Sequence, residues 1–325
     1  MSRGVKCIMN VLVTGGNGFI GKNLVKTLND TLPEEVTIYS LDNYSSSSFK
    51  NRIHWSDRVI SVHRDVRYNF LHLFNEIDID VIYHLACPAS PPIYQRSFLY
   101  THETGIYGLA NVLHLAREKQ CKVVFSSTSE VYGDPDIDEQ NEDYTGRVHT
   151  MGPRACYDES KRMGETICWD YHKTLGLDIK VARIFNTYGP YMDPQDGRII
   201  SNFINQSLAN SPLTIYGDGS QTRSLCYVSD TVDALIRLAN TDESTAATPI
   251  NVGNPVELTV LEIAEKIKDL TDSSSELEYH ELPVHDPAKR KPCIKRAKEL
   301  LDWEPKVNLN DGLLETIEYF KSLKS

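Results

Sequence analysis

The sequence predicts an α/β protein built on a doubly wound parallel sheet, with a smaller C-terminal α/β domain. Three observations support this fold class. Short apolar runs alternate with segments long enough for helices, a glycine cluster follows the first apolar run, and prolines and glycines become frequent after Asn186. Strands without a polar face are typical of parallel sheets that helices cover on both sides.

The N-terminal half is expected to alternate strands with helices. Residues 7–14 form an apolar run that ends in Gly-Gly-Asn-Gly, and the apolar residues after it have helical spacing, which predicts a strand, a glycine turn and a helix. Further strands are predicted at 36–41, 58–62, 81–85, 122–126 and 179–185. The two longest helices are expected at 100–119 and 156–175. In the C-terminal half, shorter helices are predicted at 199–209, 231–240, 260–269 and 311–321.

Composition and charge exclude several classes of partner. The chain has 325 residues, of which 40% are hydrophobic, so it can bury a large core. Its net charge of -11 argues against a nucleic-acid partner, because such binding needs clustered basic residues. No run of 18 apolar residues is present and residues 1–10 are too polar for a signal peptide, which predicts a cytoplasmic protein with no membrane partner. The seven cysteines show no Cys-x-x-Cys spacing, so we expect reduced thiols and no metal site.

The glycine cluster predicts a dinucleotide site. Gly15, Gly18 and Gly21 fit the pattern G-x-x-G-x-x-G between a strand and a helix, which lets a pyrophosphate approach backbone amides at the helix N-terminus. Asp42, at the end of the second strand, would accept hydrogen bonds from the adenosine ribose and disfavour a 2′-phosphate, so NAD is favoured over NADP. Alternatively, the glycines form only a tight turn and Asp42 caps the turn that follows it.

A second pattern places a tyrosine and a lysine four residues apart, at Tyr157 and Lys161, after the segment Ser-Thr-Ser-Glu at 127–130. On a helix, this spacing puts both side chains on one face. The lysine ammonium would lower the pKa of the phenol and make it a base near neutral pH. Such pairs are also common on solvated helix faces, so the interpretation depends on the rest of the chain.

The glycine cluster, the Ser-Thr-Ser-Glu segment and the pair Tyr157 and Lys161 together resemble the extended short-chain dehydrogenase/reductase family. This resemblance implies a Rossmann-type NAD-binding domain. Within that family, further segments resemble UDP-glucuronic acid decarboxylases, also called UDP-xylose synthases, over nearly the whole chain. The most specific segment is His-Leu-Ala-Cys-Pro-Ala-Ser-Pro at 84–91. The others lie at 133–135, 152–159, 183–190, 196–198 and 216–224.

The resemblance implies decarboxylation of UDP-glucuronic acid to UDP-xylose through a UDP-4-keto intermediate. Tyr157 would remove the C4 hydroxyl proton while hydride passes to NAD, the resulting β-keto acid would lose carbon dioxide, and the recycled cofactor would return the hydride. Lys161 would perturb Tyr157 and bind the nicotinamide ribose. Thr128 would hold the C4 oxygen, and Glu130 would orient the substrate or relay a proton near C5.

Binding residues follow from the same resemblance. The cofactor residues are Gly15, Asn17, Gly18, Phe19, Ile20, Gly21, Asp42, Asn43, Asp65, Val66, Leu85, Ala86, Thr104, Tyr157 and Lys161. The residues for the UDP-sugar are Pro88, Ser90, Tyr94, Ser129, Arg154, Asn186, Arg198, Tyr216, Arg223 and Arg290. The sequence departs from the family at Gly105, Tyr191 and Cys293, where the family has asparagine, arginine and aspartate.

Other readings remain open from the sequence. A UDP-sugar 4-epimerase, or a decarboxylase that releases the UDP-4-keto-pentose, would use the same fold and cofactor. Ser129 distinguishes the chain from sugar 4,6-dehydratases, which carry an aspartic acid there, and epimerases typically lack the carboxylate of Glu130. An NAD-binding module without catalysis would have little reason to keep Thr128, Tyr157 and Lys161 together.

Domain boundaries and assembly are also predicted. The NAD-binding domain is expected to span 1–186 plus about 225–250, and the UDP-sugar-binding domain about 187–224 plus 251–325. Helices 100–119 and 156–175 carry apolar residues on more than one face. This pattern predicts a homodimer through a four-helix bundle.

Overall fold

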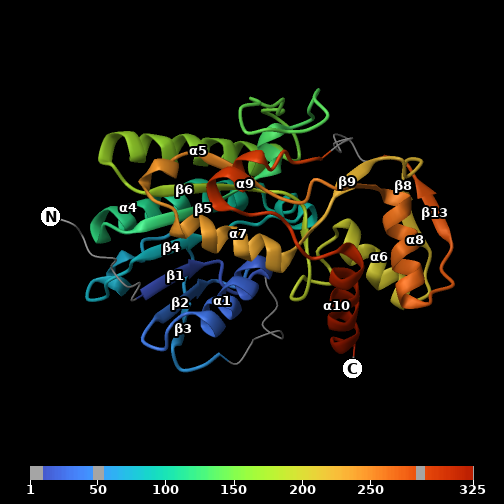
Figure 1. Ribbon diagram of the computed structural model, residues 1–325, viewed down its shortest axis with the longest axis horizontal. Coiled ribbons are helices and arrows are strands. Elements are labelled where there is room, and N and C mark those ends of the chain that lie inside the picture. Colours follow the sequence, from blue (N-terminus) through green and yellow to red (C-terminus); the bar gives the residue numbers. More distant parts are fainter. Residues whose placement is uncertain (1–9, 47–54, 283–289, 325) are drawn as a thin grey trace.

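A seven-stranded parallel sheet forms the centre of the N-terminal part (Figure 1). The computed structural model describes residues 10–46, 55–282 and 290–324. The strand order is β11-β6-β5-β4-β1-β2-β3. The strands are β1 (Asn10–Thr14), β2 (Thr37–Asp42), β3 (Val59–His63), β4 (Val81–His84), β5 (Lys122–Thr128), β6 (Ile179–Ile184) and β11 (Pro249–Val252). The predicted doubly wound sheet is confirmed, although residues 7–9 of the first predicted strand lie outside the described residues.

Helices cover both faces of this sheet. In Figure 1, α1 (Phe19–Thr31) and α7 (Val228–Asn240) lie on one side, and α4 (Leu109–Lys119) and α5 (Ala155–Leu175) lie on the other. Along β1, Val11 and Val13 join the core cluster on the α1 side, whereas Leu12 joins the cluster on the α4 side. Because adjacent strand residues point to opposite faces, both faces of an apolar strand are buried, as its unbroken apolar run predicts.

The helix predicted at 100–119 is divided into three parts. An α-helix, α3 (Phe98–Glu103), is followed by a π-helical segment, η3 (Thr104–Gly108), and then by α4. A Cβ atom at Gly105 would lie 2.6 Å from Ser160 Oγ on α5, so only glycine fits this close approach. Single π-turns of this kind are frequent at functional sites, and Thr104 lines the cleft described below.

Among the described residues, the C-terminal part contains three small sheets, three longer helices and one short helix. The longer helices are α6 (Ile199–Leu208), α8 (Val260–Thr271) and α10 (Leu309–Ser322). The strand pairs are β7 (Thr187–Tyr188) with β10 (Cys226–Tyr227), β8 (Leu213–Tyr216) with β13 (Leu277–His280), and β9 (Thr222–Ser224) with β12 (Glu257–Thr259). Figure 1 shows α6, α8, β8 and β13 gathered beside the sheet. The helices match the predicted positions, whereas the short strands were not predicted.

Short elements complete the described structure. They are α2 (Pro91–Tyr94), α9 (Lys295–Leu301), η2 (Leu71–Phe74), η4 (Ser129–Tyr132) and η5 (Glu243–Thr245). Among the described helices, none combines the length and apolarity that a bilayer crossing requires. The cysteines of the described part, Cys87, Cys121, Cys156, Cys168, Cys226 and Cys293, are free thiols, and Cys7 lies outside it. Within the same residues, no group of three or more His, Cys, Asp or Glu side chains is placed to hold a metal ion.

Candidate active site

A single large cleft of about 630 Å³ collects residues from both parts of the molecule. It lies at the carboxyl ends of the parallel strands, where ligands of open α/β sheets bind. With the exception of Asp65, every cofactor and substrate residue predicted from the sequence lines this cleft within the described part of the chain. The fold therefore brings residues as far apart in the sequence as Gly15 and Arg290 into one cleft.

The glycine turn at the start of α1 leaves no room for side chains. Gly15 has a φ of 72°, and a Cβ atom there would lie 2.7 Å from the backbone nitrogen of Ala86. At Gly21, a Cβ atom would lie 2.0 Å from the Gly15 carbonyl oxygen. The backbone and the first turn of α1 are thus packed closely against the strand ends, which leaves the amides open to a pyrophosphate.

Asp42 both supports this turn and faces the cleft. Its carboxylate accepts hydrogen bonds from the backbone N–H groups of Asn17 at 2.9 Å and Tyr44 at 2.7 Å. The capping role that the sequence left open is therefore present. A carboxylate has about four acceptor positions, so ribose hydroxyls can also bind. The tight glycine turn and this carboxylate fit an adenosine diphosphate, so the residues present are suited to NAD.

The Asp65 carboxylate binds neighbouring side chains of the protein. It contacts the Arg67 guanidinium at 3.0 Å and accepts a hydrogen bond from Asn43 at 2.9 Å. The same Asn43 amide donates to the Tyr100 hydroxyl at 2.7 Å. Val66, the next residue, lines the cleft. A direct contact between Asp65 and the cofactor stays a prediction.

The residues with predicted catalytic roles meet where β5 ends. Thr128 is the last residue of β5, and Tyr157 and Lys161 stand one turn apart on α5. The ammonium of Lys161 donates a hydrogen bond to the Ser126 carbonyl at 2.6 Å, which fixes it beside the strand. The ring of Tyr94 stacks on the ring of Tyr157 with a centroid distance of 5.3 Å and an interplanar angle of 1°. The phenol is thus held in one orientation.

The pKa of Tyr157 differs from the expectation based on spacing. Burial raises the pKa of Tyr157, and the nearby Cys87 and Glu130 raise it further. A hydrogen bond with Thr128 and the positive charge of Arg198 offset part of this shift. In the protein alone, the phenol is therefore neutral at pH 7. The spacing of Tyr157 and Lys161 led us to expect a phenol with a lowered pKa. That spacing carries no information on burial, which raises the pKa.

Glu130 is held between two arginines that are far apart in the sequence. Its Oε2 atom accepts a hydrogen bond from Arg154 Nη2, and Arg290 Nη2 lies 3.2 Å from the same oxygen. Although burial by itself raises the pKa of Glu130, the charges of Arg290 and Arg154 lower it below its ordinary value. On the side away from Glu130, Arg154 Nε lies 3.8 Å from Asp158 Oδ2. Asp158 lies within the family-like segment 152–159, and no role for it was predicted from the sequence.

The C-terminal part contributes charged and aromatic groups to the cleft. Ser90 Oγ donates a hydrogen bond to the Asp196 carbonyl at 2.5 Å, which joins the loop after β4 to the turn before α6. Arg198, at the N-terminal end of α6, lies 2.7 Å from the Asp196 carboxylate. Arg223 on β9 and Tyr216 on β8 line the opposite wall. The contact between Ser90 and Asp196 thus closes one side of the site.

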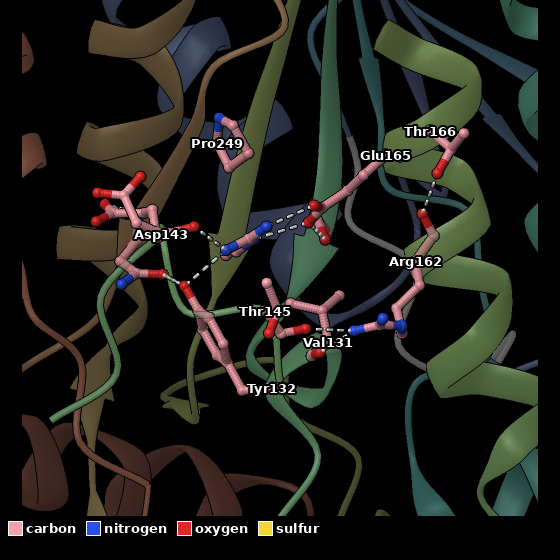
Figure 2. Close-up of polar contacts among 12 residues, drawn as sticks. Val131, Tyr132, Asp143, Thr145, Arg162, Glu165, Thr166 and Pro249 are labelled. Atoms are coloured by element: carbon pink, nitrogen blue, oxygen red, sulfur yellow. Dashed lines mark hydrogen bonds and ion pairs between the residues drawn. The ribbon is translucent and has the colours of Figure 1, made fainter. Parts of the chain in front are cut away.

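A buried polar network fixes the strand end beneath these residues (Figure 2). The guanidinium of Arg183 donates hydrogen bonds to Glu165 at 2.9 and 2.7 Å and to the Tyr132 hydroxyl at 2.9 Å. Ser127, the residue before Thr128, also donates to Glu165. The network joins β6, α5 and η4 below Thr128. Sequence reasoning missed it, because its members show no local spacing pattern.

Comparisons with known proteins agree with this geometry. The family model "NAD dependent epimerase/dehydratase family" matches residues 11–253. UDP-glucuronic acid decarboxylase 3 of Arabidopsis thaliana is 47% identical over 307 residues, which cover 94% of this chain and 87% of that protein. UDP-glucuronic acid decarboxylase 1 of Danio rerio is 46% identical over 313 residues, which cover 95% of this chain and 72% of that protein.

A solved structure extends the likeness to three dimensions. UDP-glucuronic acid 4-epimerase from Bacillus cereus, in complex with UDP-glucuronic acid and NAD, has a TM-score of 0.86 at 27% identity over 97% of this chain and 100% of that chain. The chain therefore belongs to the NAD-dependent epimerase/dehydratase family, and its relatives at 46–47% identity are UDP-glucuronic acid decarboxylases.

Proposed function

We propose that this protein is an NAD-dependent UDP-glucuronate decarboxylase, which converts UDP-glucuronic acid to UDP-xylose through a UDP-4-keto intermediate. The names of the relatives support the substrate, and the cofactor follows from the family. One observation carries the proposal. Thr128, Tyr157 and Lys161 line the same cleft in which Glu130 lies between Arg154 and Arg290.

The first step removes hydrogen from C4 of the sugar. When bound, NAD supplies the hydride acceptor and a positive charge, and it gives the hydride back after decarboxylation. Tyr157 takes the proton of the C4 hydroxyl, and Thr128 hydrogen-bonds the same oxygen. Lys161, held on the Ser126 carbonyl, adds a positive charge beside the phenol and favours its ionised form.

Loss of carbon dioxide follows from the position of the new ketone. A carboxylate β to a carbonyl leaves readily, because the electron pair of the broken bond is taken up by the carbonyl as an enolate. Glu130 lies near C5 in this proposal and carries a proton toward it. Arg154 and Arg290 hold Glu130 in place and stabilise negative charge around it.

Binding is divided between the two walls of the cleft. On the cofactor side, the glycine turn and Asp42 bind the adenosine diphosphate portion. On the other side, Asn186, Arg198 and Arg223 contact the diphosphate or sugar of the substrate, and Tyr216 lies beside the uridine. A guanidinium suits phosphate oxygens, because it donates paired hydrogen bonds. We also propose that these two walls belong to the two domains that the sequence predicts.

Product analysis tests the activity. Purified protein is incubated with UDP-glucuronate without added reductant, and carbon dioxide and nucleotide sugars are followed by NMR. We expect equal amounts of carbon dioxide and UDP-xylose. UDP-galacturonate without carbon dioxide would identify a 4-epimerase, and accumulation of UDP-4-keto-pentose would identify the variant that releases its intermediate. A mixture without any of these products would contradict the proposal.

We also propose a homodimer in the cytoplasm. Large apolar side chains are exposed on the helices of the predicted bundle: Leu99 is 79% exposed, Tyr107 59%, Met163 52% and Trp169 51%. These residues lie on α3, η3 and α5, and a second copy of the same helices would cover them by packing against this surface. The free thiols of the described part suit a reducing compartment.

A further inference from the structure

The proposed reaction consumes one proton in each turnover. The substrate carboxylate leaves as neutral carbon dioxide, and C5 receives a proton in its place, whereas the hydride and the C4 hydroxyl proton are both returned. The site must therefore take up one proton from solvent per molecule of UDP-xylose. This inference rests on the proposed function, and it concerns the route by which that proton enters.

A second, smaller cavity of about 70 Å³ lies behind the wall of the main cleft. Glu130, Arg154 and Arg290 line both cavities, so these three side chains form the wall between them. The small cavity is also lined by His149 and by Met151, which is 86% exposed. Its volume is sufficient for water, which needs about 10–15 Å³ and polar partners. The cavity therefore connects the surface with the back of Glu130.

Two acids, Asp134 and Asp158, line the small cavity and not the main cleft, and of these Asp158 is the buried one that contacts Arg154. The Asp158 side chain is 9% exposed, and among the described residues its Oδ1 atom has no hydrogen-bond partner. Buried carboxylate oxygens are rarely left without a partner, because such burial is costly. A protonated Asp158, or a water molecule in the cavity, removes this cost. The other oxygen, Oδ2, lies 3.8 Å from Arg154 Nε, and Arg154 also contacts Glu130.

We propose that Asp158 takes up the proton from water in the small cavity and passes it to Glu130, which delivers it to C5. In this step Asp158 loses its O–H proton to Glu130 through water. Glu130 then protonates C5 as the enolate electron pair forms the new C–H bond, and both carboxylates return to their ionised forms. Asp158 is reprotonated from solvent. It acts through Glu130 and is a positioning and proton-supply residue.

The electrostatic surroundings of Asp158 agree with this role. Burial, and after it the negative charge of Glu130, raise the pKa of Asp158 to about 7. Arg154 and Arg290 act in the opposite direction, and Glu159 adds to the rise. The titratable groups that face Asp158 or its cavity are Tyr94, Glu130, Asp134, Arg147, His149, Arg154, Cys156, Glu159 and Arg290. A carboxyl group with this pKa exchanges protons at neutral pH.

The test is the substitution Asp158→Asn, which keeps the size of the side chain but cannot carry the proton. We expect kcat to fall roughly tenfold to a hundredfold, within the range of general acid catalysis, with KM changed less than about threefold. In a single turnover, carbon dioxide should appear before UDP-xylose, and the solvent deuterium isotope effect on kcat should increase. A purely structural role would not separate these two products in time.

The pH profile supplies a readout that needs no variant. For the wild-type protein, kcat should decline as the pH rises through about 7, because Asp158 loses the proton that it must supply. Asp158→Glu should keep this limb with a shifted midpoint, and Asp158→Asn should lack it. The matched control is Asp170→Asn, an exposed acid farther along α5, whose pH profile should follow the wild type. A wild-type profile that is flat through this range would overturn the proposal, even if Asp158→Asn does not fold.

Different results would contradict the proposed function and the proposed proton route. If the wild-type protein releases no carbon dioxide from UDP-glucuronate, the proposed function is wrong. If it forms UDP-xylose, but Asp158→Asn does so with the same kcat, isotope effect and pH profile, only the proton route through Asp158 is wrong.

Discussion

The phenol of Tyr157 is buried against the ring of Tyr94 and lines the same cleft as Thr128. Its oxygen atom can act only on a group that enters the cleft, and removing that oxygen leaves the ring stacking intact. This geometry separates the chemistry of Tyr157 from its contribution to structure.

We therefore predict that Tyr157→Phe lowers kcat by roughly a hundredfold to ten-thousandfold, because phenylalanine cannot take the C4 proton that we assign to the Tyr157 hydroxyl. The amount of NAD that stays with the protein through gel filtration should be unchanged. Tyr144→Phe, at a phenol that bonds to Asp136 outside the cleft, is the control. Loss of NAD together with activity would show that Tyr157 is structural.

Arg223 is predicted to act on binding. Its Nη1 atom donates to the Thr222 carbonyl at 2.9 Å, and the side chain lines the cleft. Arg223→Ala should raise KM roughly tenfold or more with a smaller change in kcat, because a charged hydrogen bond contributes about 1.5–3 kcal/mol. Steady-state kinetics measures both constants, with Arg117→Ala on the surface of α4 as the control. An unchanged KM would remove Arg223 from the site.

At the scale of single residues, the sequence predicted that the proposed catalytic groups would share one cleft, but it could not predict their charge states. The spacing of Tyr157 and Lys161 placed both on one helix face. The contact between Glu130 and Arg290, by contrast, spans 160 residues, and only the folded chain creates it. The same is true of Asp158, whose environment depends on side chains from separate segments.

Among the elements, β5 and β6 carry the residues on which the site depends, and the buried ion pair of Arg183 with Glu165 joins β6 to α5. Breaking this pair would leave an unpaired guanidinium in the interior. The pair also supports the site, because Ser127, the residue before Thr128, donates a hydrogen bond to the same Glu165.

We predict that Glu165→Ala lowers the free energy of unfolding by about 3–5 kcal/mol, as expected when one partner of a buried pair is removed. Urea unfolding measures the change. Glu118→Ala, at an exposed position on α4, should change it by less than about 0.5 kcal/mol. Equal effects of the two substitutions would mean that the pair adds no stability.

The strands of the main sheet could be predicted from the sequence because each is a short apolar run between turn residues. The π-helical segment at Thr104–Gly108 could not, because it depends on the close approach of Gly105 to Ser160. The small strands of the C-terminal part were also missed. They have two to four residues each, which is too short for a periodic pattern.

For the whole molecule, the exposed apolar residues of α3, η3 and α5 decide the assembly. We predict a dimer in solution by light scattering. Trp169→Glu should shift the protein toward monomer, because a charge at a covered position is costly to bury. Leu314→Glu, at an exposed residue of α10 away from this face, should leave the dimer intact. A wild-type monomer would contradict the prediction.

The central claim is that the hydride taken from C4 of the sugar is returned to the same carbon after carbon dioxide leaves. The direct test uses UDP-glucuronate with deuterium at C4, purified protein and no added reductant, with NMR and mass spectrometry of the product. We predict UDP-xylose that retains deuterium at C4 with no loss over many turnovers. UDP-xylose with hydrogen at C4 would contradict the account.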